Sequence, residues 1–169
     1  MIARLLPVLL LAAGAPALAQ TTPAAAPQPC SGPERAQFDF WVGDWDVYPT
    51  GKDTLVAHST IEKLYGGCAV RENWKPLKGT GGGSLNAWVP AEKAWRQSWA
   101  DSSGAWVEFK GGWSGKAMVL QGDWSGVTTR MTYTPAADGS VRQHGETTKD
   151  GGQTWTTSFD LTYRPAKKT

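Results

Sequence analysis

The stretch SLNAWVPAEKAWRQSWA, residues 84–100, decides the fold. It contains two short segments, 84–89 and 94–100, in which tryptophans alternate with other residues. Successive side chains of a β-strand point to opposite faces, so this alternation indicates strands rather than helices. We therefore expect two consecutive strands here.

The same pattern continues on both sides of this stretch. Turn signals such as Asp138-Gly139 separate segments rich in Val, Thr, Trp and Tyr, and no helical periodicity interrupts them. Consecutive strands with tight turns form an antiparallel meander, and closure removes its unpaired edges. We expect an all-β fold, a single up-and-down antiparallel barrel of about 8–10 strands. The expected strands are 44–48, 55–64, 68–75, 84–89, 94–100, 105–111, 116–122, 128–134, 141–148 and 154–164.

A short helix is expected before the first strand. Ser31 suits its cap, Pro33 its first turn, and Glu34 the positive end of the helix dipole. Gly43 ends this segment. The apolar residues that we expect to face the barrel are Phe38, Phe40 and Trp41.

The N-terminus resembles a secretory signal peptide. Arg4 gives a positive start, residues 5–13 are apolar, and residues 17–19 form an A-x-A cleavage site. We therefore expect residues 1–19 to be removed during export. The mature protein would be periplasmic or secreted, with no stable membrane insertion.

Composition divides the remaining chain. Residues 20–30 are rich in Pro and Ala and form an expected flexible leader, residues 31–165 the barrel domain, and residues 166–169 a tail. The formal net charge is only +2 and no basic stripe occurs, so we expect no nucleic-acid partner.

Two cysteines, Cys30 and Cys68, follow the signal segment. An even number of cysteines in an oxidising compartment favours one disulfide. Closing this loop would contribute about 3–4 kcal/mol.

Ten tryptophans lie between residues 41 and 155, which exceeds what a core of this size needs. In three strands, side chains two positions apart place tryptophan and a polar group on one face. If that face points inward, the barrel has an aromatic interior with a few polar groups, as small-molecule pockets do. The predicted ligand-binding residues are Glu72, Trp74, Asn86, Trp88, Gln97 and Trp99, and Trp95 shares their face.

A filled core is the alternative to this pocket. The polar side chains would then satisfy one another and the indole N–H groups. Burying Glu72 is costly without a partner, so a partner such as Arg130 or Arg142 would be needed.

Residues 43–45, Gly-Asp-Trp, resemble the G-x-W element that begins the first strand of lipocalin-like, or calycin, barrels. The longer string FDFWVGDWDV, residues 38–47, resembles a family of exported bacterial proteins of unknown function with a lipocalin-like barrel. The resemblance covers the chain after residue 30 and implies that Trp45 closes one barrel end. Further matching segments are 67–68, 72–74, 84–86, 97–101, 142–146 and 150–155.

Nitrobindin, a haem-binding barrel, is a more distant resemblance. Its glycine-rich string is broken here after Trp45. Only His58 and His144 could ligate haem iron, and His144 shares a charged face with Arg142 and Glu146. We expect no cofactor.

The segment TKDGGQTW, residues 148–155, resembles the Asp-box of sialidase propellers. Its residues predict a hairpin in which Asp150 bonds the turn and Trp155 packs beneath it. We expect a structural role here.

Motifs of known catalytic and metal sites are absent from the sequence, so no catalytic or metal residues are predicted. The leading hypothesis is non-enzymatic binding of a small amphipathic or aromatic molecule. Two alternatives remain open. Exposed tryptophans would bind glycans or the cell envelope, or Glu72 and Glu146 would form the acid–base pair of a hydrolase or isomerase.

Overall fold

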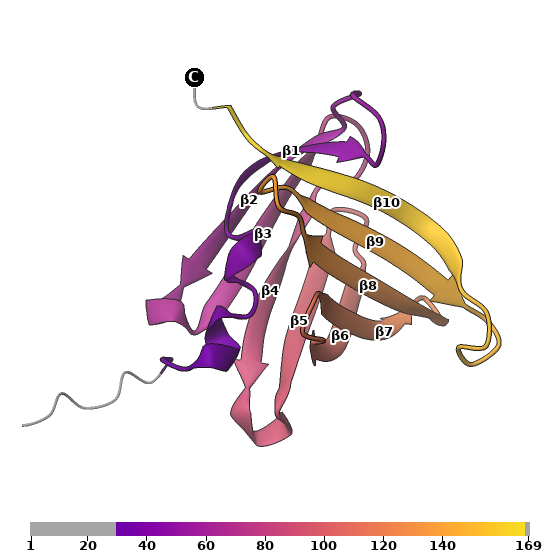
Figure 1. Ribbon diagram of the computed structural model, residues 1–169. Coiled ribbons are helices and arrows are strands. Elements are labelled where there is room, and N and C mark those ends of the chain that lie inside the picture. The colour runs from indigo at the N-terminus through magenta and orange to yellow at the C-terminus, as the bar shows by residue number, and fades with distance from the viewer. Residues whose placement is uncertain (1–29, 168–169) are drawn as a thin grey trace, which may run out of the picture.

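The computed structural model describes residues 30–167, and these form a closed antiparallel barrel of ten strands (Figure 1). Each strand pairs with its neighbours in sequence, and β1 pairs with β10 to close the barrel. The predicted all-β barrel is confirmed. Its strands are β1 (Gly43–Pro49), β2 (Ala57–Leu64), β3 (Ala69–Pro76), β4 (Gly82–Val89), β5 (Ala94–Asp101), β6 (Trp106–Trp113), β7 (Met118–Trp124), β8 (Val127–Pro135), β9 (Val141–Thr148) and β10 (Thr156–Pro165).

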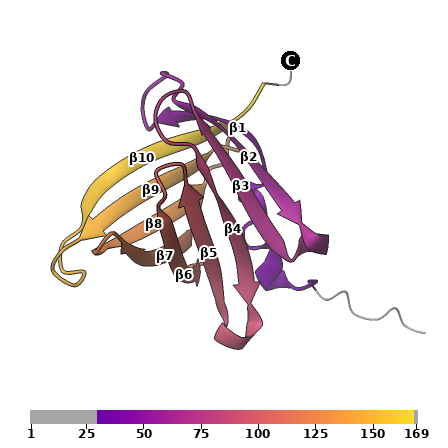
Figure 2. The same ribbon diagram turned by 180° about the vertical axis from the view of Figure 1, so that it is seen from behind.

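All ten expected strands occur, with ends that differ from the predicted ones by a few residues. Seen from behind, β3 to β6 form the near wall of the barrel (Figure 2). Two short 3₁₀ turns, η3 (Tyr65–Gly67) and η4 (Pro90–Glu92), connect β2 to β3 and β4 to β5. The predicted signal segment and most of the predicted leader lie outside the described residues.

The expected N-terminal helix is a pair of 3₁₀ turns, η1 (Pro33–Ala36) and η2 (Asp39–Trp41). The residue at the capping position is not the predicted Ser31. The capping position is Gly32, which has a φ of 139° and makes no side-chain cap. Pro33 occupies the first turn, as predicted.

The segment between η1 and β1 closes one end of the barrel with aromatic rings. Phe38 and Trp41 are fully buried and stack with ring centroids 4.9 Å apart. Phe38 also meets Trp95 and Tyr133 edge to face, at 5.6 and 5.1 Å. The indole N–H of Trp45 donates to the carbonyl of Trp41 at 2.9 Å, so the first strand is fixed to this plug.

A disulfide joins Cys30, which precedes η1, to Cys68, the residue before β3. The pairing predicted from the cysteine count is confirmed. The guanidinium of Arg35 donates to the carbonyl of Cys68 at 3.2 Å, which adds a second link between η1 and the same corner.

The tryptophan-bearing faces of β3, β4 and β5 point inward, as strand parity predicted. Glu72, Asn86 and Gln97 are buried, whereas their sequence neighbours on the other face are more exposed. One tryptophan, Trp106 on β6, is 69% exposed on the outside. Val107 and Phe109 of the same strand are buried and point inward. The sequence of this strand is apolar on both faces, so strand parity alone did not show which face points into the barrel.

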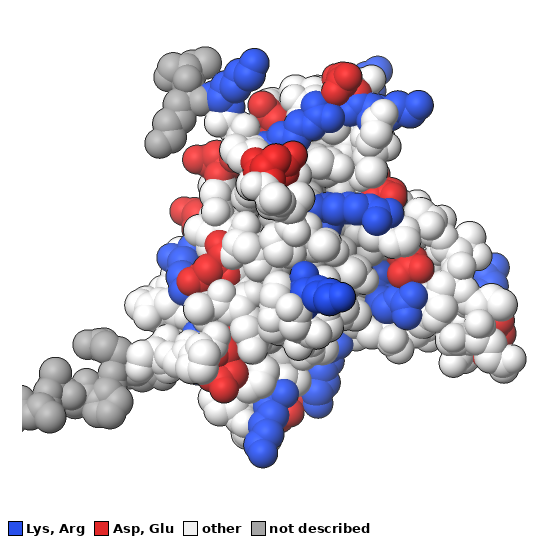
Figure 3. Space-filling model, viewed as in Figure 1, with Lys and Arg blue, Asp and Glu red and all other residues white. Residues whose placement is uncertain are grey.

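The outer surface carries basic and acidic side chains side by side (Figure 3). Arg130 pairs with Glu146 at 2.9 Å and Arg142 with Asp160 at 2.6 Å. Neither arginine therefore reaches the barrel interior to pair with Glu72, and that prediction was wrong. Residues 30–167 contain no helix that is long and apolar enough to cross a membrane.

The Asp-box-like segment forms the predicted structural hairpin between β9 and β10. Asp150 accepts from the Thr154 hydroxyl at 2.5 Å and from its backbone N–H at 2.9 Å. These bonds hold the pKa of Asp150 well below its usual range. The Trp155 indole donates to the carbonyl of Gly152, and the Arg130 guanidinium lies 3.9 Å from the Trp155 ring centre.

Candidate ligand cavity

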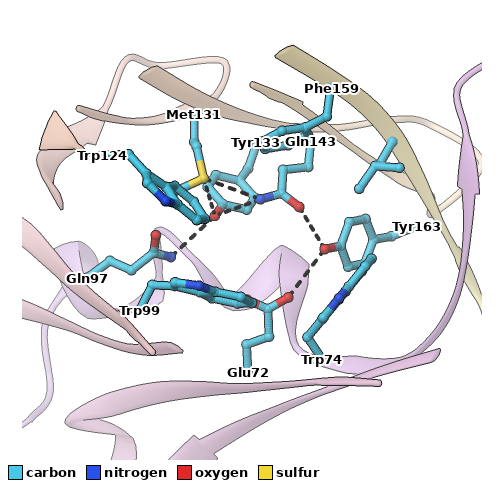
Figure 4. A pocket seen from close by; sticks show the side chains of 11 residues that line it. Glu72, Trp74, Gln97, Trp99, Trp124, Met131, Tyr133, Gln143, Phe159 and Tyr163 are labelled. Carbon is cyan, nitrogen blue, oxygen red and sulfur yellow. Dashed lines mark hydrogen bonds between the residues drawn. The ribbon is translucent and has the colours of Figure 1, made fainter. Parts of the chain in front are cut away.

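A cavity of about 200 Å³ lies inside the barrel. Its lining separates into an apolar wall and a polar floor (Figure 4). The wall consists of Trp74, Trp99, Trp124, Met131, Phe159 and Leu161, and the floor of Glu72, Gln97, Tyr133, Gln143 and Tyr163. Tyr133 and Tyr163 also contact Trp41 of the plug, so the floor rests on the closed end of the barrel.

Glycines at inward positions make room for the wall rings. A Cβ atom on Gly145 would overlap the ring of Phe159, and one on Gly82 would lie 2.9 Å from the ring of Trp99. The absence of side chains at these positions therefore lets large aromatic residues fold over the cavity.

The floor is held by a closed ring of side-chain hydrogen bonds. The Tyr163 hydroxyl donates to Gln143 Oε1 at 2.7 Å, and Gln143 Nε2 donates to the Tyr133 hydroxyl at 3.1 Å. Gln97 Nε2 donates both to the Tyr133 hydroxyl, at 3.2 Å, and to Asn86 Oδ1, at 2.7 Å. Asn86 Nδ2 donates to the Ser84 hydroxyl at 3.0 Å, and the Ser84 hydroxyl donates to Glu72 Oε2 at 3.2 Å. The Tyr163 hydroxyl, 3.3 Å from Glu72 Oε1, closes the ring. Side chains that bond one another in this way restrict one another's rotamers.

One backbone carbonyl sets the orientation of two amides in this ring. Asn86 Nδ2 donates to the carbonyl of Val70 at 3.0 Å, so Asn86 Oδ1 turns toward Gln97. That oxygen needs a donor, which fixes Gln97 Nε2 toward it. Gln97 Oε1 is consequently left buried without a hydrogen-bond partner.

Glu72 is buried within the barrel and has no basic partner among the lining residues. Its carboxyl accepts from the Ser59 hydroxyl at 3.3 Å and from the Ser84 hydroxyl at 3.2 Å. The Tyr163 hydroxyl lies 3.3 Å from the same carboxyl and shares its one proton between Glu72 and the nearer Gln143 Oε1. Burial raises the pKa of Glu72 to about 7, and the three hydroxyls only partly oppose this rise. Three hydroxyls thus take the place that the sequence assigned to an arginine.

The two tyrosines of the floor remain neutral. Burial, together with the nearby Glu72 carboxyl, raises the pKa of both Tyr133 and Tyr163 well above the usual value. The floor therefore contains one group, Glu72, that titrates in the neutral range.

Four of the six predicted ligand-binding residues line the cavity: Glu72, Trp74, Gln97 and Trp99. Asn86 lies below the floor, where it orients Gln97. Trp88 shares the inward face but lies toward the plugged end, beside a second groove that Arg35 and Lys93 also line.

Seven lining residues were missed by sequence reasoning. They are Trp124, Met131, Tyr133, Gln143, Phe159, Leu161 and Tyr163. Strand parity, applied to β8 as it was to β3, β4 and β5, places Met131 and Tyr133 on one face. The same parity places residues 159, 161 and 163 of β10 on one face. Gln143 carries the same signal, because it lies two residues from the buried Val141.

The proposed acid–base pair of Glu72 and Glu146 is not formed. Glu72 points into the barrel, whereas Glu146 pairs with Arg130 on the outer face. The wall of the barrel separates the two carboxyl groups, and the hypothesis that they share a cavity is wrong.

The histidines do not face the cavity either. His58 bonds Asp46 at 2.8 Å, and His144 bonds Thr157 at 2.9 Å, both on the outside. His144 lies near Glu146, in agreement with the predicted charged face. No histidine therefore presents a haem ligand to the interior. Within residues 30–167, no three His, Cys, Asp or Glu side chains gather where they could hold a metal ion.

The tryptophans do not form an exposed row. Among the ten, all of which lie in the described part of the chain, Trp106 is exposed and the others are buried or half-buried. Glycan binding through several coplanar surface indoles therefore loses its structural basis.

The fold and the cavity together define a closed β-barrel with an aromatic interior site. Comparison of the chain with models of known protein families and with curated proteins gives no match.

Proposed function

We propose that this protein binds a small amphipathic or aromatic molecule, without covalent chemistry, inside the barrel. The observation that carries the proposal is the cavity itself, in which aromatic walls face a floor of polar side chains. An apolar wall supplies affinity through burial, and a few fixed polar groups supply orientation.

The cavity volume limits the size of the ligand. An apolar protein cavity of about 150 Å³ is large enough for benzene. A cavity of about 200 Å³ therefore suits a ligand with one or two rings, or a short branched chain of similar size. A porphyrin is far larger than this cavity. The residues that line the cavity also include no histidine that could bind haem iron.

We further propose that the protein acts outside the cytoplasm, in the periplasm or after secretion, and that it belongs with the exported lipocalin-like proteins that its opening motif resembles. The disulfide between Cys30 and Cys68 supports the location, because such bonds persist in oxidising compartments. The signal-like sequence of residues 1–19 supports it independently.

A fluorescence titration tests the binding proposal. The probe is 1-naphthylamine, a two-ring molecule that is neutral at neutral pH and emits more strongly in apolar surroundings. We expect saturable enhancement with the wild-type protein. Leu161→Trp should abolish it, because Leu161 lines the cavity and a larger side chain would fill it.

Leu85→Trp is the matched control, since Leu85 lies exposed on the outer face. This variant should retain the enhancement. Circular dichroism confirms that each variant is folded. Equal loss of the signal in both folded variants, or no saturable signal in the wild type, would contradict binding in the cavity.

A further inference from the structure

The floor of the cavity offers acceptors rather than donors. Both N–H groups of the Gln97 amide are used, one by Asn86 and one by Tyr133. Gln143 donates to Tyr133 and to the sulfur of Met131, and the Tyr163 hydroxyl donates within the ring. Gln97 Oε1 has no partner, but it has almost no accessible surface and cannot be reached from the cavity. The acceptor that the floor offers to a ligand is the Glu72 carboxyl group. A ligand that completes the floor must bring an N–H or O–H donor.

The charge of the lining points the same way. Glu72 is the only carboxyl group among the lining residues, and no Lys, Arg or His lines the cavity with it. Its carboxyl is surrounded by hydroxyls and not by a cation. A buried carboxylate gains from a counter-charge, whereas an anionic ligand would be repelled.

The wall suits a cation as well. Trp74, Trp99 and Trp124 contribute three indoles, and the rings of Trp99 and Trp124 have centroids 6.4 Å apart with a 40° angle between their planes. Indole faces attract cations more strongly than other aromatic rings do. The Trp99 indole N–H is turned away to Asp101, at 3.1 Å.

We infer that the ligand is an organic amine, bound in its protonated form with the Glu72 carboxylate as acceptor and with its apolar part among the tryptophans. The inference rests on the proposed function and names the ligand class of the same cavity. Figure 4 shows Glu72 and Gln97 on the floor, with Trp74, Trp99 and Trp124 around them.

The titration behaviour of Glu72 supports this ligand class. Burial without a counter-charge raises the pKa of Glu72 to about 7, so part of the population is ionised at neutral pH. The side chains that face it are Ser59 of β2, Ser84 of β4 and Tyr163 of β10. The pKa of Tyr163 lies well above the usual value, as does that of Tyr133, so among the groups of the cavity floor Glu72 is the one that titrates between about pH 5 and 8.

Three probes with the same ring test the inference by isothermal titration calorimetry. They are 2-phenylethylamine, a cation; 2-phenylethanol, a neutral donor; and 3-phenylpropanoate, an anion. At about pH 8, we expect the amine to bind at least about tenfold more tightly than the alcohol, as expected for a charge-assisted hydrogen bond. The anion should bind more weakly than either.

Glu72→Gln should remove the preference, so that the amine and the alcohol bind with similar affinity. The control Glu146→Gln should keep it, because Glu146 lies on the outer face. The wild type provides a test that needs no variant. As the pH falls from about 8 to about 5.5, protonation of Glu72 should reduce the affinity for the amine about tenfold or more and leave that for the alcohol unchanged.

Equal binding of the amine and the alcohol by the wild type at about pH 8 would overturn the inference and leave the proposed function intact. Tightest binding of the anion would also overturn it, and would indicate that the indole N–H groups of Trp74 and Trp124 recognise the ligand instead. If 1-naphthylamine and all three probes fail to bind, the proposed function fails with it.

Discussion

Replacing Glu72 by Gln should change how the stability of the barrel depends on pH. The pKa of Glu72 is about 7 in the folded protein and 4.5 in the reference state. Below about pH 4.5, the carboxyl is protonated in both the folded and the unfolded chain. Between pH 4.5 and 7, the folded protein retains the proton and the unfolded chain loses it, so the free energy of unfolding falls as the pH rises. The pKa difference corresponds to roughly 3 kcal/mol lost across this interval.

A neutral amide at position 72 can still bond the hydroxyls of Ser59, Ser84 and Tyr163, which donate and accept. The Glu72→Gln variant should therefore lack this decline and gain up to about 3 kcal/mol over the wild type between pH 4.5 and 8. Urea unfolding monitored by circular dichroism at several pH values measures the difference. Glu146→Gln, on the outer face, should follow the wild type. Parallel stability curves for Glu72→Gln and the wild type would refute the reasoning.

Three further changes test the parts of the barrel that support the cavity. Phe38→Ala leaves a hole in the plug and should cost about 3–5 kcal/mol in urea unfolding, and a loss below about 1 kcal/mol would contradict a packed plug. The double variant Cys30→Ser/Cys68→Ser opens a loop spanning a sequence separation of 38 and should lose about 4 kcal/mol, whereas an unchanged midpoint would show that the disulfide stabilises nothing. Gly145→Ala forces the ring of Phe159 to move and should lower both stability and the saturable 1-naphthylamine signal, while wild-type values of both would disprove the close approach.

The strands could be predicted from the sequence because their signals are local. Alternation of side chains and glycine-rich turns recur along the chain, and both act over a few residues. Inward and outward faces followed from the same parity, which placed Glu72, Asn86 and Gln97 inside. The number of strands and their closure through β1 and β10 agree with the edge argument.

The site was only half predictable because a barrel cavity is assembled from strands far apart in the sequence. Tyr163 of β10 reaches Glu72 of β3 across 91 residues, and no local pattern joins them. Charge complementarity suggested an arginine as the partner of Glu72. The structure shows instead that strand parity sends Arg130 and Arg142 outward, to Glu146 and Asp160. Applying parity to each strand, arginines included, would have excluded that partner.

The unpaired Gln97 Oε1 could not be predicted from the sequence. It depends on the carbonyl of Val70, which sets the Asn86 amide and through it the Gln97 amide. Such an orientation is a property of three-dimensional hydrogen bonding, and residue types alone do not specify it.

The most direct test of binding inside the barrel is an NMR titration of the assigned indole N–H resonances with 1-naphthylamine. The signals of Trp99 and Trp124 should shift together and saturate, because both rings line the cavity. The signal of Trp106, exposed on the outer face, should stay in place. Movement of Trp106 with no change at Trp99 and Trp124 would contradict an internal site.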